Sequence, residues 1–250
     1  MTFSADWLTL RHRADVAARN RQVAARLGHA FAGREGLRVL DLGAGTGNNM
    51  RLTSQYLPGE QHWVLADADA ALLARVLPVN RVRFETRVCD LATDLDDLMA
   101  EHVDLVTASA LFDLCGAAWL DRLIAALGTA NRALFAVLSY DGREEWSPPH
   151  PADSEVLRAF HADQRQDKGL GPSLGPEAHA YLAEGLRAKG FEVIEGTSDW
   201  VLAPPADRAM IASLAEAGGA IAGNREWAQA RARADGARIG HKDLLALPPR

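Results

Sequence analysis

The chain has 250 residues, of which 48% are hydrophobic and 24% are charged, and its formal net charge at pH 7 is −6. These values are ordinary for a soluble globular protein that can bury a core. The acidic balance argues against a nucleic-acid partner, since phosphate binding needs a basic face. The sequence has no apolar run of the roughly 20 residues that cross a membrane and no signal-peptide pattern. We therefore expect a cytoplasmic protein with two reduced cysteines.

Residues 6–31 carry apolar side chains at helical spacing, while the arginines fall mostly on the remaining faces. This pattern predicts a helix with one solvated side. Gly33 and Gly36 then release the chain toward a short buried strand that ends at Leu42.

Three glycines at alternate positions, Gly43, Gly45 and Gly47, separate this strand from a helix that starts at Asn48. A strand that turns directly into a helix must bend tightly, and glycine accepts the positive φ angles that the bend needs. The first N–H groups of the helix point back into the loop. The turn therefore suits the close approach of a polar or anionic ligand.

An acid, Asp41, stands two residues before Gly43, and the position that a dinucleotide fingerprint needs small is occupied by Asn48. The stretch VLDLGAGTGNN at 39–49 resembles motif I of the class I S-adenosylmethionine (SAM)-dependent methyltransferases. The resemblance implies an α/β fold: a doubly wound, Rossmann-like, seven-stranded sheet with helices on both faces and an antiparallel last strand. It also implies SAM as cofactor and S-adenosylhomocysteine as product. The loop residues expected to hold the cofactor are Asp41, Gly43, Ala44, Gly45, Gly47 and Asn48.

Later strands supply further cofactor residues. Asp67 ends a strand at 62–67 and is placed to bind both ribose hydroxyls, followed by Ala68, whereas Asp69 is expected to cap the helix 70–77. In the family an acid after the third strand, here 82–88, often meets the adenine amino group. Asp90 with Leu91 has that place, although Asp90 could instead cap a helix. Ser109 follows the fourth strand, 103–108, where the family lines the gap between methyl donor and acceptor.

The stretch Ser109-Ala110-Leu111-Phe112 lacks the Asn/Asp-Pro-Pro-Tyr pattern of enzymes that methylate amino groups of bases. A fifth strand is predicted at 133–138, followed by an insertion at about 140–175 that we interpret as a lid or substrate-binding loop. Its side chains include the candidates for catalysis, Tyr140, His150 and His161.

The rest of the chain completes one domain that spans 1–250. An extended sixth strand is expected at 191–202, a helical insertion at about 204–236 and a last strand at 242–247. Because related methyltransferases often carry an N-terminal helical cover, residues 1–36 are interpreted as a cover in which Trp7, Arg11 and His12 fold over the cofactor. The competing interpretation is a plain solvated helix.

Methyl transfer from a sulfonium is an in-line displacement, so alignment and exclusion of water are most of what an enzyme contributes. We therefore expect a SAM-dependent methyltransferase for a small-molecule acceptor, with no nucleic-acid or membrane partner. Two alternatives stay open: a nucleotide- or dinucleotide-dependent oxidoreductase, and a methyltransferase-like binding module without turnover. Asp113 and Asp141 stand near positions where some relatives bind a metal, but the accompanying Asp-Asn pair is missing, so no metal is expected.

Overall fold

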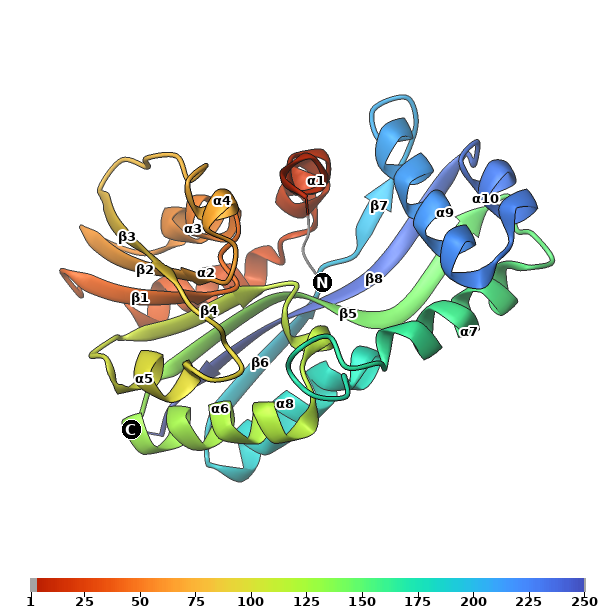
Figure 1. Ribbon diagram of the computed structural model, residues 1–250. Helices are drawn as coiled ribbons and strands as arrows, with labels where there is room; N and C mark the ends of the chain where they lie inside the picture. Colours follow the sequence, from red (N-terminus) through yellow and green to blue (C-terminus); the bar gives the residue numbers. More distant parts are fainter. Residues whose placement is uncertain (1–3, 250) are drawn as a thin grey trace.

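The computed structural model describes residues 4–249 and arranges them as a mixed β-sheet with helices on both faces (Figure 1). The strands are β1 (Leu37–Leu42), β2 (Gln61–Asp67), β3 (Val82–Val88), β4 (Leu105–Ser109), β5 (Ala133–Ser147), β6 (Glu192–Thr197), β7 (Trp200–Leu202) and β8 (Gly236–Leu247). The α-helices are α1 (Ala5–Ala18), α2 (Arg21–Ala30), α3 (Asn48–Thr53), α4 (Ala70–Leu73), α5 (Leu95–Ala100), α6 (Ala117–Ala130), α7 (Asp153–Gln164), α8 (Ala178–Ala188), α9 (Arg208–Ala222) and α10 (Arg225–Arg231). Short 3-10 helices are η1 (Ser54–Tyr56), η2 (Phe112–Leu114) and η3 (Gly175–Glu177).

The strand order is β3-β2-β1-β4-β5-β8-β6, with β7 paired to β8. Strands β1 to β5 are parallel to their neighbours in that group, and β8 is antiparallel to β5, β6 and β7. The doubly wound α/β fold with an antiparallel last strand is therefore confirmed. The predicted count of seven is corrected, because within residues 4–249 the sheet has eight strands. The predicted sixth strand breaks at 198–199 into β6 and β7.

Strands β5 and β8 are much longer than their sequences indicated. They pair from Leu134 and Ala246 at one end to Ser147 and Gly236 at the other, with two register shifts on the way. The first eight residues of the predicted insertion at 140–175 are therefore strand, and the helical and loop part starts only after Ser147. The predicted insertion at 204–236 holds α9 and α10, which pack with α7 beside this extended end of the sheet (Figure 1).

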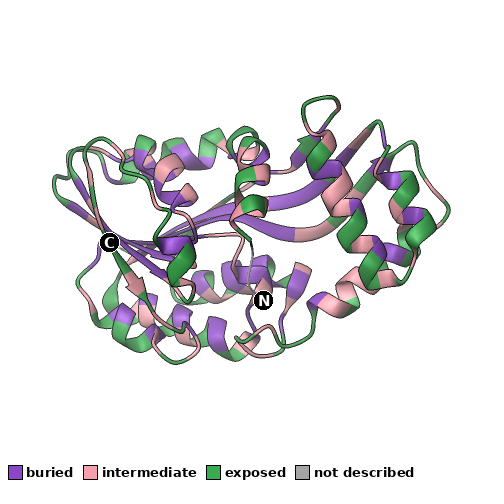
Figure 2. Ribbon diagram, turned by 45° about the horizontal axis from the view of Figure 1, so that its top comes forward, coloured by how far each residue is buried: buried purple, intermediate pink, exposed green. Residues whose placement is uncertain are grey.

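Three apolar clusters hold the layers together, and the strands are the most completely buried part of the molecule (Figure 2). One cluster joins α5, α6 and α8 to one face of the sheet, and a second joins α2 and the start of α3 to the other. The third lies at the extended end, where Trp146 meets Trp227 with ring centroids 5.5 Å apart. The sheet thus forms a rigid platform whose parallel strands end beneath α1.

The helix predicted over 6–31 is two helices. The side chain of Asn20 accepts hydrogen bonds from the N–H groups of Gln22 and Val23, so it caps α2 and separates it from α1. Helix α1 packs against β7, where Trp200 Nε1 donates to Asp15 Oδ1 at 3.0 Å. The predicted N-terminal cover starts at residue 1, and residues 1–3 lie outside the described part of the chain.

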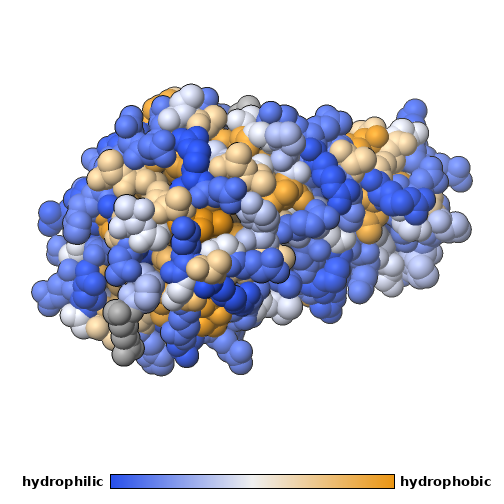
Figure 3. All heavy atoms as spheres, turned by 90° about the horizontal axis from the view of Figure 1, so that it is seen from below, coloured by the Kyte–Doolittle hydropathy of each residue, from blue (hydrophilic) through white to orange (hydrophobic). Residues whose placement is uncertain are grey.

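The side of the molecule on which α5, α6 and α8 lie is mainly hydrophilic, with small separate hydrophobic patches (Figure 3). Among residues 4–249, no helix is both long enough and apolar enough to span a bilayer.

Candidate active site: two adjoining cavities

The loop between β1 and α3 has the left-handed backbone that its three glycines predict. Gly43, Gly45 and Gly47 have φ angles of 67°, 53° and 73°, in the left-handed region that other residues rarely adopt. A Cβ on Gly45 would come within 3.1 Å of Leu8 Cδ1 in α1, and a Cβ on Gly43 within 3.3 Å of Leu111 Cδ1. The backbone of the loop, which carries no side chain at these glycines, therefore lies close to Leu8 and Leu111.

A cavity of about 620 Å³, which we call the glycine-loop cavity, opens where β1, β2 and β4 end. Its volume is typical of a site for a small molecule or cofactor, and its position is where open α/β sheets bind ligands. Seven of the predicted cofactor residues line it: Gly43, Gly45, Asp67, Ala68, Asp90, Leu91 and Ser109. Leu8 and Arg11 of α1 and residues 168–170 complete the wall.

Asp67 stands at the end of β2 and faces this cavity. Its Oδ2 accepts a hydrogen bond from Gly45 N at 2.7 Å, and its Oδ1 accepts one from Asp69 N at 2.9 Å. A carboxylate has about four acceptor positions, so both oxygens retain capacity for a ligand. Asp69 caps α4 as predicted, because its Oδ1 accepts from the N–H groups of Ala71 and Leu72.

Asp90 lies at the far side of the same cavity. Its Oδ1 accepts from Ala92 N at 2.9 Å, and its own N–H donates to Asp94 Oδ2, so the acid orders a turn. Helix α5 begins only at Leu95 and Asp94 is its first flanking residue, so Asp90 is not the cap of that helix. Its Oδ2 forms no hydrogen bond within the described residues and remains available on the cavity wall.

Four predicted cofactor residues, Asp41, Ala44, Gly47 and Asn48, do not line the cavity. Asp41 is fully buried beneath the loop, where its Oδ1 accepts from Asn49 Nδ2 at 2.8 Å. Burial raises the pKa of Asp41 to about 7. Ala44 and Gly47 form the turn itself, through Gly47 N donating to Ala44 O at 2.9 Å. These residues therefore belong to the loop or support it, and they do not line the cavity.

A second cavity of about 390 Å³ adjoins the first, and we call it the aromatic cavity. The two share the wall residues Arg11, Ala110, Leu114 and Lys168. Its other walls come from α1, β5, α7, β7, α9 and β8 and are mainly apolar: they include Trp7, Leu138, Tyr140, Phe160, Trp200, Leu214, Ala217, Ile221 and Ile239. A mostly apolar lining with a few polar atoms is typical of small-molecule sites.

Of the three predicted catalytic residues, Tyr140 alone lines the aromatic cavity. Its hydroxyl lies 3.1 Å from Glu144 Oε1 and 3.0 Å from His161 Nε2, so His161 reaches the cavity wall only through Tyr140. Burial and the carboxylate of Glu144 raise the pKa of Tyr140 well above its usual value, and the phenol stays protonated. Contrary to prediction, His150 lines neither cavity. It lies in the turn that precedes α7, where its Nδ1 accepts from Ala152 N at 3.1 Å.

Arg11, which was predicted as part of the cover over the cofactor, lines the aromatic cavity together with Asp113 and His241, which were not predicted as site residues. Arg11 bonds Asp15 through Nε, and its guanidinium lies 5.0 Å from the centre of the Trp200 ring. Asp113 Oδ2 accepts from Gln164 Nε2 at 3.0 Å, and burial raises its pKa to about 6. His241, on β8, is 4% exposed. No local pattern marks Asp113 or His241 as site residues, because α1, η2 and β8, three elements distant in sequence, bring the three side chains together.

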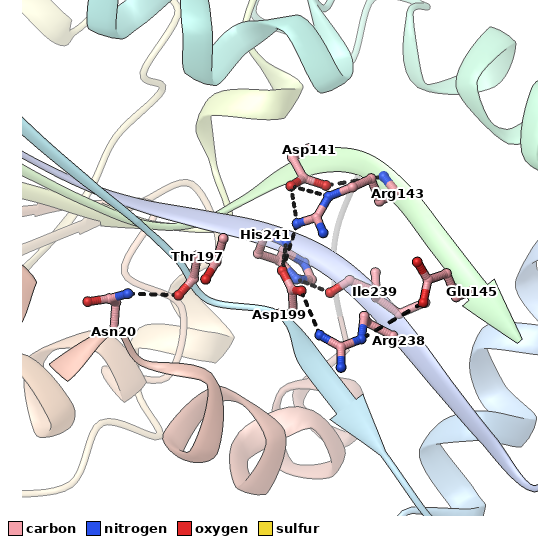
Figure 4. A network of polar contacts seen from close by, with 9 residues as sticks. All are labelled: Asn20, Asp141, Arg143, Glu145, Thr197, Asp199, Arg238, Ile239 and His241. Carbon is pink, nitrogen blue, oxygen red and sulfur yellow. Dashed lines mark hydrogen bonds and ion pairs between the residues drawn. The ribbon is translucent and has the colours of Figure 1, made fainter. Parts of the chain in front are cut away.

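A network of ion pairs at the molecular surface fixes the part of β8 that carries His241 (Figure 4). The carboxylate of Asp199 accepts from Arg143 Nη2 at 2.9 Å, from Arg238 Nη1 at 3.2 Å and from the backbone N–H of His241 at 3.2 Å. Arg143 also pairs with Asp141 on β5. Within residues 4–249, no group of three or more His, Cys, Asp or Glu side chains is placed to hold a metal ion.

No family model and no curated protein matches this sequence. The fold, in contrast, is similar to solved structures. A putative methyltransferase from Bacillus halodurans C-125 has a TM-score of 0.52 at 13% identity, over 92% of this chain and all of that one. A cyclopropane synthase from Mycobacterium tuberculosis has a TM-score of 0.53 at 12% identity, over 98% and 94%. A mycolic acid cyclopropane synthase complexed with SAH and CTAB has a TM-score of 0.52 at 12% identity, over 97% and 94%.

Proposed function

We propose that this protein is a SAM-dependent methyltransferase that acts on a small, largely apolar acceptor. The observation that carries the proposal is the pair of adjoining cavities. One is built from a glycine loop and two carboxylates at the ends of parallel strands, and the other is apolar and shares a wall with it. A methyl donor and a methyl acceptor held in these cavities would meet across Ala110 and Leu114.

The glycine-loop cavity fits SAM on the chemistry of its walls. Asp67 retains acceptor positions for two ribose hydroxyls, and the free Oδ2 of Asp90 suits the amino group of adenine. The bare backbone at Gly43 and Gly45 admits a ligand at the place that a Cβ would fill. When bound, SAM supplies a methyl group on a positively charged sulfur.

The residues of the chain orient the reactants and keep water away. Helix α1 contributes Leu8 to one cavity, Trp7 to the other and Arg11 to both, so we infer that it serves as a cover. Lys168 also reaches both cavities and is held by Asp163 at 2.9 Å, which anchors the loop after α7 to that helix. Closure by these two segments is consistent with a reaction that depends on alignment and exclusion of water.

The structural similarities support the proposal through the fold, since methyltransferases and SAM-related synthases share this topology. An oxidoreductase could use a similar loop, and a binding module could retain the site without turnover. Calorimetry with SAM, S-adenosylhomocysteine and NAD in parallel tests the first alternative: we expect micromolar binding of the first two and none of NAD. Tighter binding of NAD would overturn the proposal.

Turnover tests the second alternative. We expect a screen of small aromatic and alicyclic compounds with methyl-labelled SAM to transfer label to at least one of them. A Gly45→Ala variant run in parallel is the control, because a variant that binds SAM less tightly should transfer less label. Binding of SAM without transfer to any compound would favour the binding module.

A further inference from the structure

Among the polar side chains of the aromatic cavity, His241 has an imidazole whose two nitrogens have different surroundings. Nδ1 lies 3.0 Å from the backbone oxygen of Ile239, which can only accept, so Nδ1 carries the proton and donates it. The other nitrogen, Nε2, has no hydrogen-bond partner within residues 4–249. It is also not one of the unpaired atoms that are fully buried in the protein. Since the residue lines the cavity, Nε2 is an acceptor open to its contents.

The ring is held rigidly in this orientation. It lies against Trp200 with centroids 4.4 Å apart and edge-on to Tyr140 at 6.0 Å. The backbone of His241 is fixed by Asp199, and a Cβ on the preceding Gly240 would clash with Asp141 Oδ1. Such support by packing and hydrogen bonds is what a group needs to act at one position and angle.

Three other polar residues of the cavity already have partners. The Tyr140 hydroxyl is shared between Glu144 and His161, and Lys168 is paired with Asp163. Asp113 accepts from Gln164, and its remaining oxygen is sealed from the cavity. The neutral imidazole is also favoured by its surroundings, because burial and the charge of Arg11 lower the pKa of His241 to about 4.

We propose that His241 Nε2 accepts the proton of a hydroxyl or amino group on an acceptor whose aromatic or alicyclic body fills the aromatic cavity. This deepens the proposed function and rests on it, since it names the acceptor class and the group that receives its proton. The S–CH3 bond of SAM breaks with its electron pair kept by sulfur, a lone pair of the acceptor oxygen or nitrogen forms the new bond to carbon, and the proton passes to Nε2. The imidazolium then loses this proton to water.

The test uses 2-naphthol, which has an aromatic body and one O–H donor, and naphthalene, which lacks the donor. Both are titrated into protein saturated with S-adenosylhomocysteine, with the fluorescence of Trp7 and Trp200 as the signal. Wild type should bind 2-naphthol at least tenfold more tightly than naphthalene. Equal affinities, or no binding of either compound, would overturn the inference. Failure of S-adenosylhomocysteine to bind the same samples would instead overturn the proposed function.

Two variants of the same residue separate the roles of the two nitrogens. The substitution His241→Asn keeps a donor near the Nδ1 position but removes the acceptor, whereas His241→Gln can place an oxygen near the position of Nε2. The preference for 2-naphthol should therefore vanish in His241→Asn and persist in part in His241→Gln. The matched control is His179→Asn, because His179 is equally buried but bonds Glu195 away from both cavities. It should leave the preference unchanged.

A measurement on wild type alone keeps the inference open to refutation if a variant does not fold. In protein labelled with ¹⁵N at histidine, His241 should show a protonated Nδ1 and an unprotonated Nε2 at pH 7. Addition of 2-naphthol should shift the Nε2 resonance toward the protonated value, and naphthalene should not. An Nε2 that is protonated at the start, or one that ignores 2-naphthol, would exclude it as the proton acceptor.

Discussion

The carboxylate of Asp67 accepts a 2.7 Å hydrogen bond from the backbone N–H of Gly45 and so ties the end of β2 to the loop after β1. The two residues are 22 positions apart, yet their relation follows from parallel pairing of β1 with β2, which places Leu42 opposite Ala66. The bond holds the loop in its ligand-accepting shape and at the same time orients the acid toward the cavity. Loop and acid therefore act as one unit.

A Cβ at position 45 should disrupt that unit. The φ angle of Gly45 is 53°, and the new Cβ would lie 3.1 Å from Leu8 Cδ1, so Gly45→Ala strains the loop and crowds α1. We expect at least a tenfold loss of S-adenosylhomocysteine affinity by calorimetry. Gly33→Ala is the matched control: its φ is 76° and its Cβ would meet nothing within 4 Å, so it imposes similar strain away from the site. Equal affinity in wild type and Gly45→Ala would show that the cofactor binds elsewhere.

The two neighbouring acids after β2 should differ in what their removal changes. Asp67→Ala removes the charge-assisted bonds proposed for the ribose, worth roughly 1.5–3 kcal/mol each, and should weaken S-adenosylhomocysteine binding at least tenfold. Asp69→Ala removes the cap of α4 and should cost about 1 kcal/mol of unfolding free energy with little loss of affinity. Calorimetry and urea denaturation of both variants test this. A larger affinity loss for Asp69→Ala would exchange the assigned roles.

The part of the site that could be predicted is the part that is local in sequence. Gly43 to Gly47 and the acid at 67 are recognisable because the turn chemistry and the strand ends lie within short segments. The predicted end of β5 at Leu138 was wrong for the opposite reason. Its continuation contains Gly142, with a φ of 88°, and polar residues that interrupt the strand pattern, and pairing with a distant strand keeps it extended.

Pairing with strands distant in sequence also explains why the first half of β8 was not predicted. Its first half, GARIGH at 236–241, contains two glycines and alternates poorly, and only pairing with β5 and β7 makes it a strand. His241 enters the aromatic cavity through that pairing, so no inspection of the residues around it could have marked it. In α1, the apolar spacing was recognised, whereas the break at Asn20 depends on a cap and on Asn20 N donating to Asp243 on β8.

Among the predicted catalytic residues, substitution should reduce turnover only where the residue contacts the aromatic cavity. Tyr140→Phe leaves Glu144 Oε1 and His161 Nε2 without their shared partner, which should cost about 1–3 kcal/mol of unfolding free energy. With an acceptor identified by the labelled-SAM screen, kcat/KM should fall at least tenfold, about 1.4 kcal/mol, while S-adenosylhomocysteine affinity stays normal.

His150→Ala provides the contrast, because His150 lies outside both cavities and bonds only within the turn that begins α7. Its turnover should remain within twofold of wild type. A tenfold loss in this variant, with Tyr140→Phe unaffected, would place the acceptor near the start of α7 instead.

The unusual pKa of His241 should appear in the pH dependence of folding. Burial and the positive charge of Arg11 lower this pKa to about 4, against the opposing effects of the Ile239 carbonyl and the carboxylates of Asp141 and Asp199. Unfolded histidine titrates near 6.5, so between these values the unfolded chain binds more protons than the folded one. Stability therefore rises with pH across this window. The loss of unfolding free energy caused by the lowered pKa of His241 is complete below about pH 4 and absent above about pH 6.5.

A variant without the imidazole should lack this contribution. We expect the unfolding free energy of wild type minus that of His241→Asn to rise by up to about 3 kcal/mol from pH 4 to pH 7. Urea denaturation at four pH values measures it, and taking the difference removes the titration of groups that the substitution leaves alone. A difference that stays flat, or that falls as pH rises, would mean that the imidazole is protonated in the folded protein. Nε2 would then already hold a proton and could not accept one from a bound hydroxyl.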